Sequence, residues 1–133
     1  MWLVAPVGPS WSVSPALSYA VVVLLVVVGF AFDLLGLLAF RASQTTVNPL
    51  KPERASALVT SGVYRFTRNP IYVGMCFLLL AWAVYLSALL PFAGPLVFVL
   101  YITRFQIQPE ELVLVQLFGE QYAQYTTRVR RWL

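Results

Sequence analysis

Long apolar runs separated by shorter polar segments set the pattern of this 133-residue chain. The run at 17–40 contains one ionisable residue, and a second apolar region from 71 to 107 is interrupted by a Pro- and Gly-containing segment at 91–95. A helix of roughly 20 apolar residues is long enough to cross a bilayer. We therefore predict spans over 17–40, 71–90 and 92–107, the last two forming a helical hairpin.

The segment 109–125 has an amphipathic pattern. Pro109 suits the first position of a helix, and Glu110 and Glu111 suit its first turn, where the helix dipole favours negative charge. Apolar residues at 112, 115 and 118 share one face at helical spacing. We predict a surface helix over 109–125, followed by a basic, Trp-containing tail.

The remaining segments are predicted to lack long helices. The uncharged stretch 1–16 has three prolines and two tryptophans. We predict an irregular segment at the membrane interface that leads into the first span. The basic stretch 41–69 reads as a loop with at most short helical pieces. The chain is thus predicted to be one all-α integral membrane domain covering residues 1–133.

Composition and charge place this domain in a membrane. Hydrophobic residues make up 60% of the chain and charged residues 11%, which is far from a typical soluble domain. All nine Lys and Arg residues fall between 41 and 68 or from 104 onward. Such clusters favour anionic headgroups over nucleic acid, and they orient the C-terminus and the 41–69 loop toward the cytoplasm. We expect the bacterial inner (plasma) membrane.

The chain has no His and a single Cys. The usual general base at neutral pH and the commonest metal ligand are therefore missing. A zinc or haem site is not expected, and we predict no metal.

Asp33 is the ionisable residue of the first apolar run. Gly29, Asp33 and Gly36 share a helix face, and small residues mark helix–helix contacts in lipid. Asp33 is therefore expected to face the bundle. It is either a functional carboxylate or a structural partner of an arginine such as Arg68 or Arg104.

The clearest candidate for a binding site is the start of the second span. Asn69 and Pro70 suit the N-cap and first position of a helix, with the Asn side chain accepting from free backbone amides. Arg68 lies beside this helix N-terminus, which favours anions. Gly74 permits a close approach to the backbone. Aromatic and basic residues recur here every fourth position, at Tyr64, Arg68 and Tyr72.

The hairpin should bring this helix start next to Glu110 and Glu111 at one membrane face. Arginine and helix amides suit a carboxylate, the glutamates suit an ammonium group or ribose hydroxyls, and aromatic faces suit a sulfonium-like cation. S-adenosylmethionine contains all three groups. Methyl transfer from it needs positioning and exclusion of water rather than a nucleophile or a metal.

The same residues resemble a known family. The stretches LVTSGVYRFTRNPIYVG at 58–74, PEEL at 109–112 and FGEQYAQYTTRVRRW at 118–132 are similar to the isoprenylcysteine carboxyl methyltransferases and phospholipid methyltransferases. These are membrane enzymes that use S-adenosylmethionine. Their signature is Arg-His-Pro-x-Tyr-x-Gly followed by a Glu-Glu pair. Here Asn69 stands in place of the His.

The resemblance implies which residues form the site. Arg68, Asn69 and Glu111 would be catalytic. The cofactor pocket would be lined by Tyr64, Arg68, Asn69, Pro70, Tyr72, Gly74, Glu110, Glu111, Tyr122 and Tyr125. Because Asn69 does not titrate, we favour an anionic acceptor. The acceptor would be lipophilic or small and enter from the bilayer, and a second copy of the chain could complete the cavity.

Other interpretations stay open at this stage. The chain could be an NADPH-dependent membrane reductase of the sterol-reductase type, or a non-catalytic scaffold. Glu110 and Glu111 could serve only as helix-capping residues, and Tyr122 and Tyr125 as interfacial packing. The tail residues Arg128, Arg130 and Arg131 are expected to contact lipid headgroups, with Trp132 as an interfacial anchor.

Overall fold

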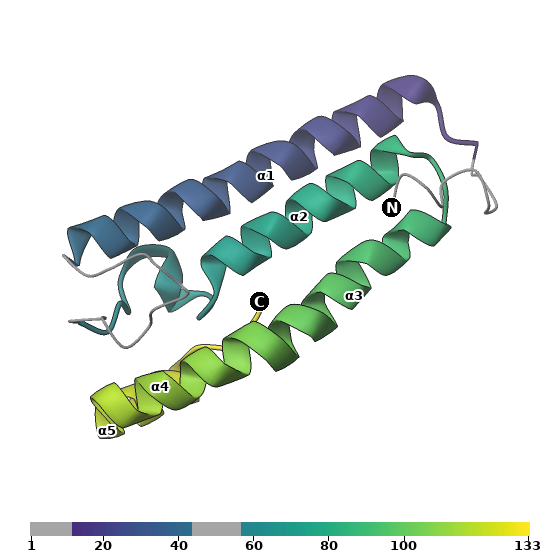
Figure 1. Cartoon of the computed structure of the whole chain (residues 1–133). Helices are drawn as coiled ribbons and strands as arrows, with labels where there is room; N and C mark the ends of the chain where they lie inside the picture. Colours follow the sequence, from purple (N-terminus) through teal and green to yellow (C-terminus); the bar gives the residue numbers. More distant parts are fainter. Residues whose placement is uncertain (1–11, 44–56) are drawn as a thin grey trace.

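The computed structural model describes residues 12–43 and 57–133, and within these ranges all regular structure is helical. Three rods lie side by side: α1 (Pro15–Ala42), α2 (Pro70–Tyr85) and a longer helical run from Leu90 to Phe118 (Figure 1). A short 3₁₀ turn, η3 (Gly62–Arg65), leads into α2. The predicted all-helical architecture is confirmed.

The α1 helix begins with a capped turn. The Ser14 hydroxyl accepts a hydrogen bond from the Leu17 amide at 3.2 Å, and Pro15 occupies the first helical position. This satisfies a backbone donor that the first turn would otherwise leave free. Large apolar side chains are exposed along the helix, among them Leu17, Val23, Leu24, Val27, Phe30, Leu34, Leu35 and Leu38. Such a surface suits lipid rather than water.

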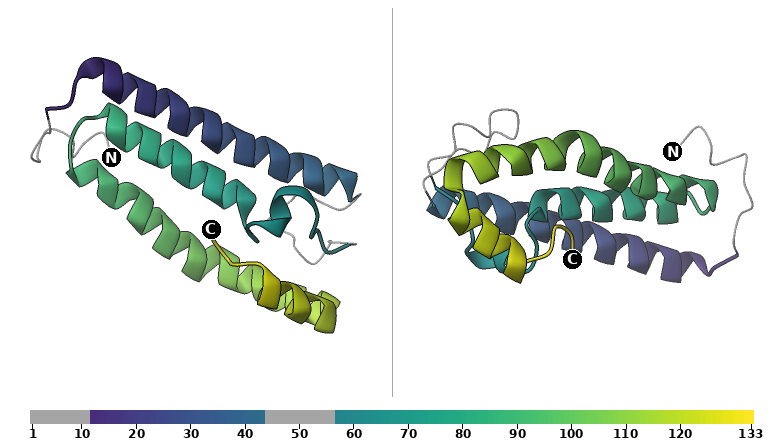
Figure 2. Two further views of the ribbon diagram at one scale, coloured as in Figure 1. Left: turned by 180° about the vertical axis from the view of Figure 1, so that it is seen from behind. Right: turned by 90° about the horizontal axis from the view of Figure 1, so that it is seen from below.

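Small residues bring α1 and α2 into close contact. A Cβ atom added to Gly74 would contact Asp33 Oδ1 and would lie 2.7 Å from the Gly29 carbonyl oxygen. One added to Gly36 would lie 3.1 Å from a side-chain atom of Ile71. Because Gly36 meets the start of α2 and Gly29 meets its middle, the two helices run antiparallel (Figure 2). The predicted shared face of Gly29, Asp33 and Gly36 is confirmed.

Asp33 faces α2, as expected, but the described residues give it no arginine partner. Within residues 12–43 and 57–133, its Oδ1 atom has no hydrogen bond, and no salt bridge joins it to Arg68 or Arg104. The proposed structural pairing with Arg68 or Arg104 is therefore wrong. The close packing of Asp33 on Gly74 is what the structure shows instead.

The Leu90–Phe118 run is continuous where the sequence predicted a break. It passes from η4 (Leu90–Phe92) through α3 (Ala93–Ile102) and a π-helical turn, η5 (Thr103–Ile107), into α4 (Gln108–Phe118). Pro109 lies within the first two positions after the π turn and is accommodated there. The predicted boundary between 107 and 109 is therefore wrong, and so is a single helix over 109–125.

The break comes at Gly119 instead. Its φ of 51° lies in the left-handed region that glycine adopts at little cost. The chain then turns back as α5 (Glu120–Arg128). The reversal places α5 against α4 and leaves the C-terminal tail beside the start of α2 (Figures 1 and 2).

Two described helices are long and apolar enough to cross a membrane, Pro15–Ala42 and the Leu90–Phe118 run. The predicted span at 71–90 corresponds to α2, an apolar helix of 16 residues that ends at Tyr85. The count of three spans and the surface position of the C-terminal helix remain predictions. Residues 1–11 of the predicted lead-in and residues 44–56 of the predicted loop lie outside the described residues.

The α1–α2 contact gives the first testable prediction. Gly74→Ala places a methyl group against Asp33 and the Gly29 carbonyl, so the helices must separate. Overpacking of this kind costs about 1–3 kcal/mol. We expect a lower thermal unfolding midpoint in detergent or nanodiscs. The neighbouring Met75→Ala, on an exposed side chain, serves as the control, and equal midpoints for the two variants would contradict the packing argument.

Candidate functional site

The two predicted halves of the site meet in the structure. Arg68 Nη1 lies 3.1 Å from Glu111 Oε1, although the residues are far apart in the chain. Both side chains are largely buried, with 14% and 17% of their surface exposed. The hairpin of α2 and the Leu90–Phe118 run therefore brings the Arg68–Gly74 segment beside the glutamate pair, as predicted.

Glu111 has a second cationic partner, Arg131. The Arg131 guanidinium donates from Nε to Oε1 at 2.9 Å and from Nη2 to Oε2 at 2.8 Å. A two-point pair of this kind fixes both groups in one plane. The prediction that Arg131 contacts lipid headgroups is therefore wrong. Arg128 and Arg130 have exposed side chains, and their headgroup contacts remain a prediction.

The tail that carries Arg131 is held by its main chain as well. The Arg68 amide donates to the Arg130 carbonyl at 2.9 Å, and Asn69 Nδ2 donates to the Arg131 carbonyl at 2.9 Å. The Thr67 hydroxyl donates to the same Arg131 carbonyl at 3.3 Å. The segment just before α2 and the C-terminal tail thus form one hydrogen-bonded unit.

Asn69 occupies the predicted N-cap position, but its side chain makes no capping hydrogen bond. The expected acceptance from free amides is wrong, because the Asn69 amide group instead donates to the tail. The first turn of α2 is left without a side-chain cap. Its backbone donors therefore remain available to an anion.

Glu110 has a different environment from its neighbour. It accepts from the Tyr72 hydroxyl at 3.0 Å and from Gln106 Nε2 at 2.6 Å, both at Oε1. Gln106 belongs to the π turn. Trp132 Nε1 donates to Thr103 Oγ1 of the same turn at 3.1 Å, so this turn contacts both the glutamate pair and the tail. A π turn inside an α-helix often marks a functional site.

Three of the four tyrosines predicted to line the pocket are buried. Tyr64, Tyr122 and Tyr125 are 7%, 4% and 4% exposed. The Tyr125 hydroxyl donates to the Tyr64 carbonyl at 2.8 Å, and Arg68 Nη1 donates to the Tyr122 hydroxyl at 3.2 Å. Burial raises the pKa of Tyr122; Glu111 adds to this rise and Arg68 opposes it. The hydroxyl is therefore neutral at physiological pH.

The Arg68–Gly74 motif divides between two faces. Pro70 is fully buried and lies next to Gly36, and Gly74 packs on Asp33 and Gly29, so both serve the contact with α1. Arg68 and Tyr72 reach the glutamates of α4 instead. One short segment thus supplies helix packing on one side and polar chemistry on the other.

Four residues of this cluster were missed by the sequence reasoning: Thr67, Thr103, Gln106 and Arg131. Gln106 precedes Glu110 by four positions, a spacing at which helix side chains meet, and this signal could have identified it. The other three contacts join segments distant in sequence, and no periodicity indicates them.

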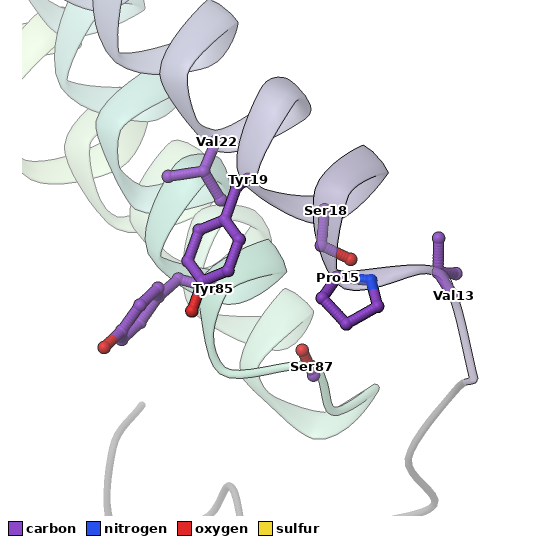
Figure 3. A pocket seen from close by; sticks show the side chains of 7 residues that line it. All are labelled: Val13, Pro15, Ser18, Tyr19, Val22, Tyr85 and Ser87. Carbon is purple, nitrogen blue, oxygen red and sulfur yellow. The ribbon is translucent and has the colours of Figure 1, made fainter.

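A cavity of about 140 Å³ lies at the far end of α2 (Figure 3). Its lining includes Ser18 and Tyr19 of α1, together with Tyr85 at the end of α2 and Ser87 just after it. Tyr85 ends α2, whereas Arg68 precedes its first turn. This cavity is therefore separate from the Arg68–Glu111 cluster.

Comparison with known proteins bears on this arrangement. The model of the phospholipid methyltransferase family matches residues 17–121. A probable protein-S-isoprenylcysteine O-methyltransferase of Oryza sativa is 34% identical over 115 residues, covering 82% of this chain and 57% of the rice protein. The protein-S-isoprenylcysteine O-methyltransferase of Mus musculus is 39% identical over 77 residues, covering 54% of this chain and 25% of the mouse protein.

An uncharacterized protein of Haemophilus influenzae is 41% identical over 63 residues, which cover 47% of this chain and all of that protein. No solved structure gives a significant match. The chain spans about a quarter of the mouse relative and somewhat over half of the rice relative. The resemblance expected from the motifs is confirmed by a family match that covers most of the sequence, and the chain belongs to the phospholipid methyltransferase family.

Proposed function

We propose that this chain is a membrane-embedded methyltransferase that uses S-adenosylmethionine. The observation that carries the proposal is the Arg68–Glu111 contact at 3.1 Å. It joins the two halves of the motif beside the start of α2, whose first turn has no side-chain cap. Cationic, anionic and backbone donor groups thus converge at one end of the bundle.

The donors present suit the carboxylate of such a cofactor. Arg68 Nε is buried and has no hydrogen-bond partner among the described residues. A buried donor left unpaired is costly, and a ligand carboxylate would satisfy it. The uncapped first turn of α2 adds backbone N–H groups and the positive end of a helix dipole.

The acceptors suit the rest of the cofactor. Glu110 and Glu111 can accept from an ammonium group or from ribose hydroxyls, and the Tyr72 ring offers an aromatic face to a cationic sulfur. When bound, S-adenosylmethionine supplies an activated methyl group for in-line displacement. The chain would bind and orient the two reactants and exclude water, which requires neither a His base nor a metal.

We propose a lipophilic or small acceptor that approaches through the bilayer: an isoprenylcysteine-type carboxylate, a thiol or a phospholipid headgroup. The exposed apolar surface of α1 supports lateral entry. We also propose that the site faces the cytoplasm of a bacterial inner membrane. All nine Lys and Arg residues fall between 41 and 68 or from 104 onward, in the two parts of the chain that supply the site, and positive charges mark the cytoplasmic face of a membrane protein.

Asn69 would support this chemistry by holding the C-terminal tail in place rather than by transferring a proton. Its side-chain amide donates to the Arg131 carbonyl, so it holds the tail that in turn fixes Glu111. An amide is not a base at neutral pH. We therefore propose that its contribution is to keep the tail against the site.

The binding of the cofactor can be tested by calorimetry on the full chain in nanodiscs. We expect saturable binding of S-adenosylmethionine but not of NADPH. Arg68→Gln removes a charge-assisted hydrogen bond of about 1.5–3 kcal/mol, so we expect the affinity to fall roughly 10- to 100-fold. Arg104→Gln is the matched control, because Arg104 is exposed and, among the described residues, its guanidinium contacts Gln108 and the Phe105 ring of the same helical run.

Three outcomes would contradict the proposal. They are the absence of saturable S-adenosylmethionine binding by the wild-type chain, equal affinities for the two variants, and tight binding of NADPH alone. If S-adenosylmethionine binds as expected, methyl transfer to membrane components can be followed with a radiolabelled methyl donor. The labelled product would identify the acceptor among the three classes named above.

The role of Asn69 can be tested separately. Asn69→Asp keeps the shape of the side chain but replaces the Nδ2 donor by a carboxylate oxygen. Two acceptor oxygens, that of Asp and the Arg131 carbonyl, would then face each other, and the hydrogen bond would be lost. We expect faster amide hydrogen exchange over residues 129–133 and weaker cofactor binding. Asn69→His, which retains a ring N–H donor, should exchange more slowly than Asn69→Asp. Unchanged exchange in Asn69→Asp would show that the tail does not depend on this contact.

A further inference from the structure

Among the described residues, three arginines at the end of the bundle that carries the candidate site have no anionic partner. Arg65 belongs to the 3₁₀ turn before α2, Arg128 ends α5, and Arg130 lies in the tail. All three are exposed. None of them forms a salt bridge within the described residues, and the carboxylate of Glu111 is already paired with two other arginines.

Hydrogen bonds hold the two segments that carry these arginines side by side. The Tyr125 hydroxyl donates to the Tyr64 carbonyl at 2.8 Å, and the Arg68 amide donates to the Arg130 carbonyl at 2.9 Å. Residue 65 lies between these links on one segment, and residue 128 lies between them on the other. The three guanidinium groups therefore belong to neighbouring stretches of backbone.

The side chains between the two links divide into buried and exposed positions. Thr67 and Val129 are buried, with 0% and 9% of their surface exposed. The residues next to them lie on the outside: Phe66 is 72% exposed, and the exposed arginines of the tail flank Val129 on both sides. We call the four outward residues the basic surface: Arg65, Phe66, Arg128 and Arg130.

The depth of the basic surface follows from the contact of its segment with α1. The rings of Tyr64 and Phe40 meet edge to face with centroids 5.4 Å apart, and a Cβ atom added to Gly62 would lie 3.6 Å from the Cβ of Ala39. Phe40 is the last residue of the apolar run at 17–40, and Arg41 follows it. The α1 helix is long and apolar enough to cross a membrane, which places the end of this run, and the basic surface with it, at the headgroups.

Chemistry and depth together favour the headgroup of an anionic phospholipid as the ligand. Guanidinium groups form strong, often two-point hydrogen bonds with phosphate, and clustered basic residues at a membrane face attract anionic lipids. An exposed Phe ring such as that of Phe66 suits the boundary between headgroups and hydrocarbon. An acidic protein could also pair with the arginines, but it would need to reach the headgroup level to cover this ring.

We propose that the basic surface binds the headgroup of an anionic phospholipid and that the bound lipid holds the C-terminal tail against the segment before α2. A phosphate that contacts Arg65 and Arg130 together would bridge the two segments. Since the tail also carries Arg131, which pairs with Glu111, this bridge would stabilise the ion cluster of the site. Headgroup contacts were expected for Arg128 and Arg130 singly; here they belong to a surface shared by two segments, whatever cofactor the site binds.

Lipid binding is measured on the full chain in detergent micelles, by titrating phosphatidylglycerol or phosphatidylcholine and following the first bound lipid by native mass spectrometry. The variants are Arg65→Gln, Arg130→Gln and the control Arg104→Gln. The control removes the same charge at an exposed position whose guanidinium, among the described residues, contacts Gln108 and the Phe105 ring. Unfolding midpoints are compared in parallel to exclude loss of the fold.

We expect the wild-type chain to bind phosphatidylglycerol more tightly than phosphatidylcholine. Arg65→Gln and Arg130→Gln should each weaken binding of phosphatidylglycerol roughly fivefold, the contribution of one basic residue near an anionic membrane surface. Binding of phosphatidylcholine should change less, since its headgroup carries no net charge. Arg104→Gln should weaken binding of phosphatidylglycerol less than either of the other variants.

Amide hydrogen exchange at Arg68 tests the hold on the tail, because this amide donates to the Arg130 carbonyl and is freed when the tail leaves. Exchange is measured on the full chain in phosphatidylcholine nanodiscs with and without phosphatidylglycerol, in the absence of cofactor. We expect slower exchange in the discs that contain phosphatidylglycerol. This effect of the lipid should vanish in the triple variant Arg65→Gln/Arg128→Gln/Arg130→Gln and persist in Arg104→Gln.

Three results would overturn the proposal. If the wild-type chain binds both lipids equally, the basic surface is not a lipid site, and binding of soluble polyglutamate would then indicate an acidic protein partner. If Arg104→Gln weakens binding of phosphatidylglycerol as much as Arg130→Gln does, net charge decides the preference. If exchange at Arg68 is the same with and without phosphatidylglycerol, the lipid does not hold the tail. None of these results changes the proposed function, which calorimetry with S-adenosylmethionine tests separately.

Discussion

The position of Glu111 between two arginines is the interaction on which the rest of the site depends. Arg68 comes from the segment before α2, Glu111 from α4 and Arg131 from the C-terminal tail. One carboxylate therefore joins three parts of the chain that lie far apart in sequence. Because all three side chains are at least partly buried, loss of Glu111 would leave two neighbouring guanidinium groups without compensation, and such losses are costly.

This ion cluster is supported by contacts that keep its backbone in place. The tail carbonyls accept from Arg68, Asn69 and Thr67, and the Trp132 indole donates to Thr103. On the opposite face of the same segment, Pro70 and Gly74 pack against α1. The start of α2 is thus fixed from two sides, which is what a site that works by positioning requires.

The sequence allowed much of this arrangement to be predicted. Apolar run lengths identified the helices, and the small residues Gly29 and Gly36 identified the face of α1 that meets α2. The meeting of Arg68 and Glu111 followed from the hairpin alone. These features depend on composition and on spacing along one helix, which a single sequence displays directly.

Other features depended on contacts between distant segments and were not predictable. Arg131 follows the last helix and shows no periodic relation to Glu111, and it lies beyond the residues matched by the family. The position of Asn69 at the start of α2 predicted that its side chain would cap the helix. Its amide instead donates to the Arg131 carbonyl of the tail, a partner that the sequence near Asn69 does not show. The π turn likewise leaves no mark in the spacing of apolar residues, so the predicted break near Pro109 was misplaced.

The π turn also bears on how the chain can vary in length. A π turn accommodates one residue more than an α-helix would in the same stretch, and each residue of an α-helix turns the following side chains by about 100°. Relatives that lacked this extra residue, with the same helix ends, would direct the glutamate pair away from Tyr72 and Arg68. Selection would therefore act on the number of residues between the hairpin and Glu110, and not only on which residues they are.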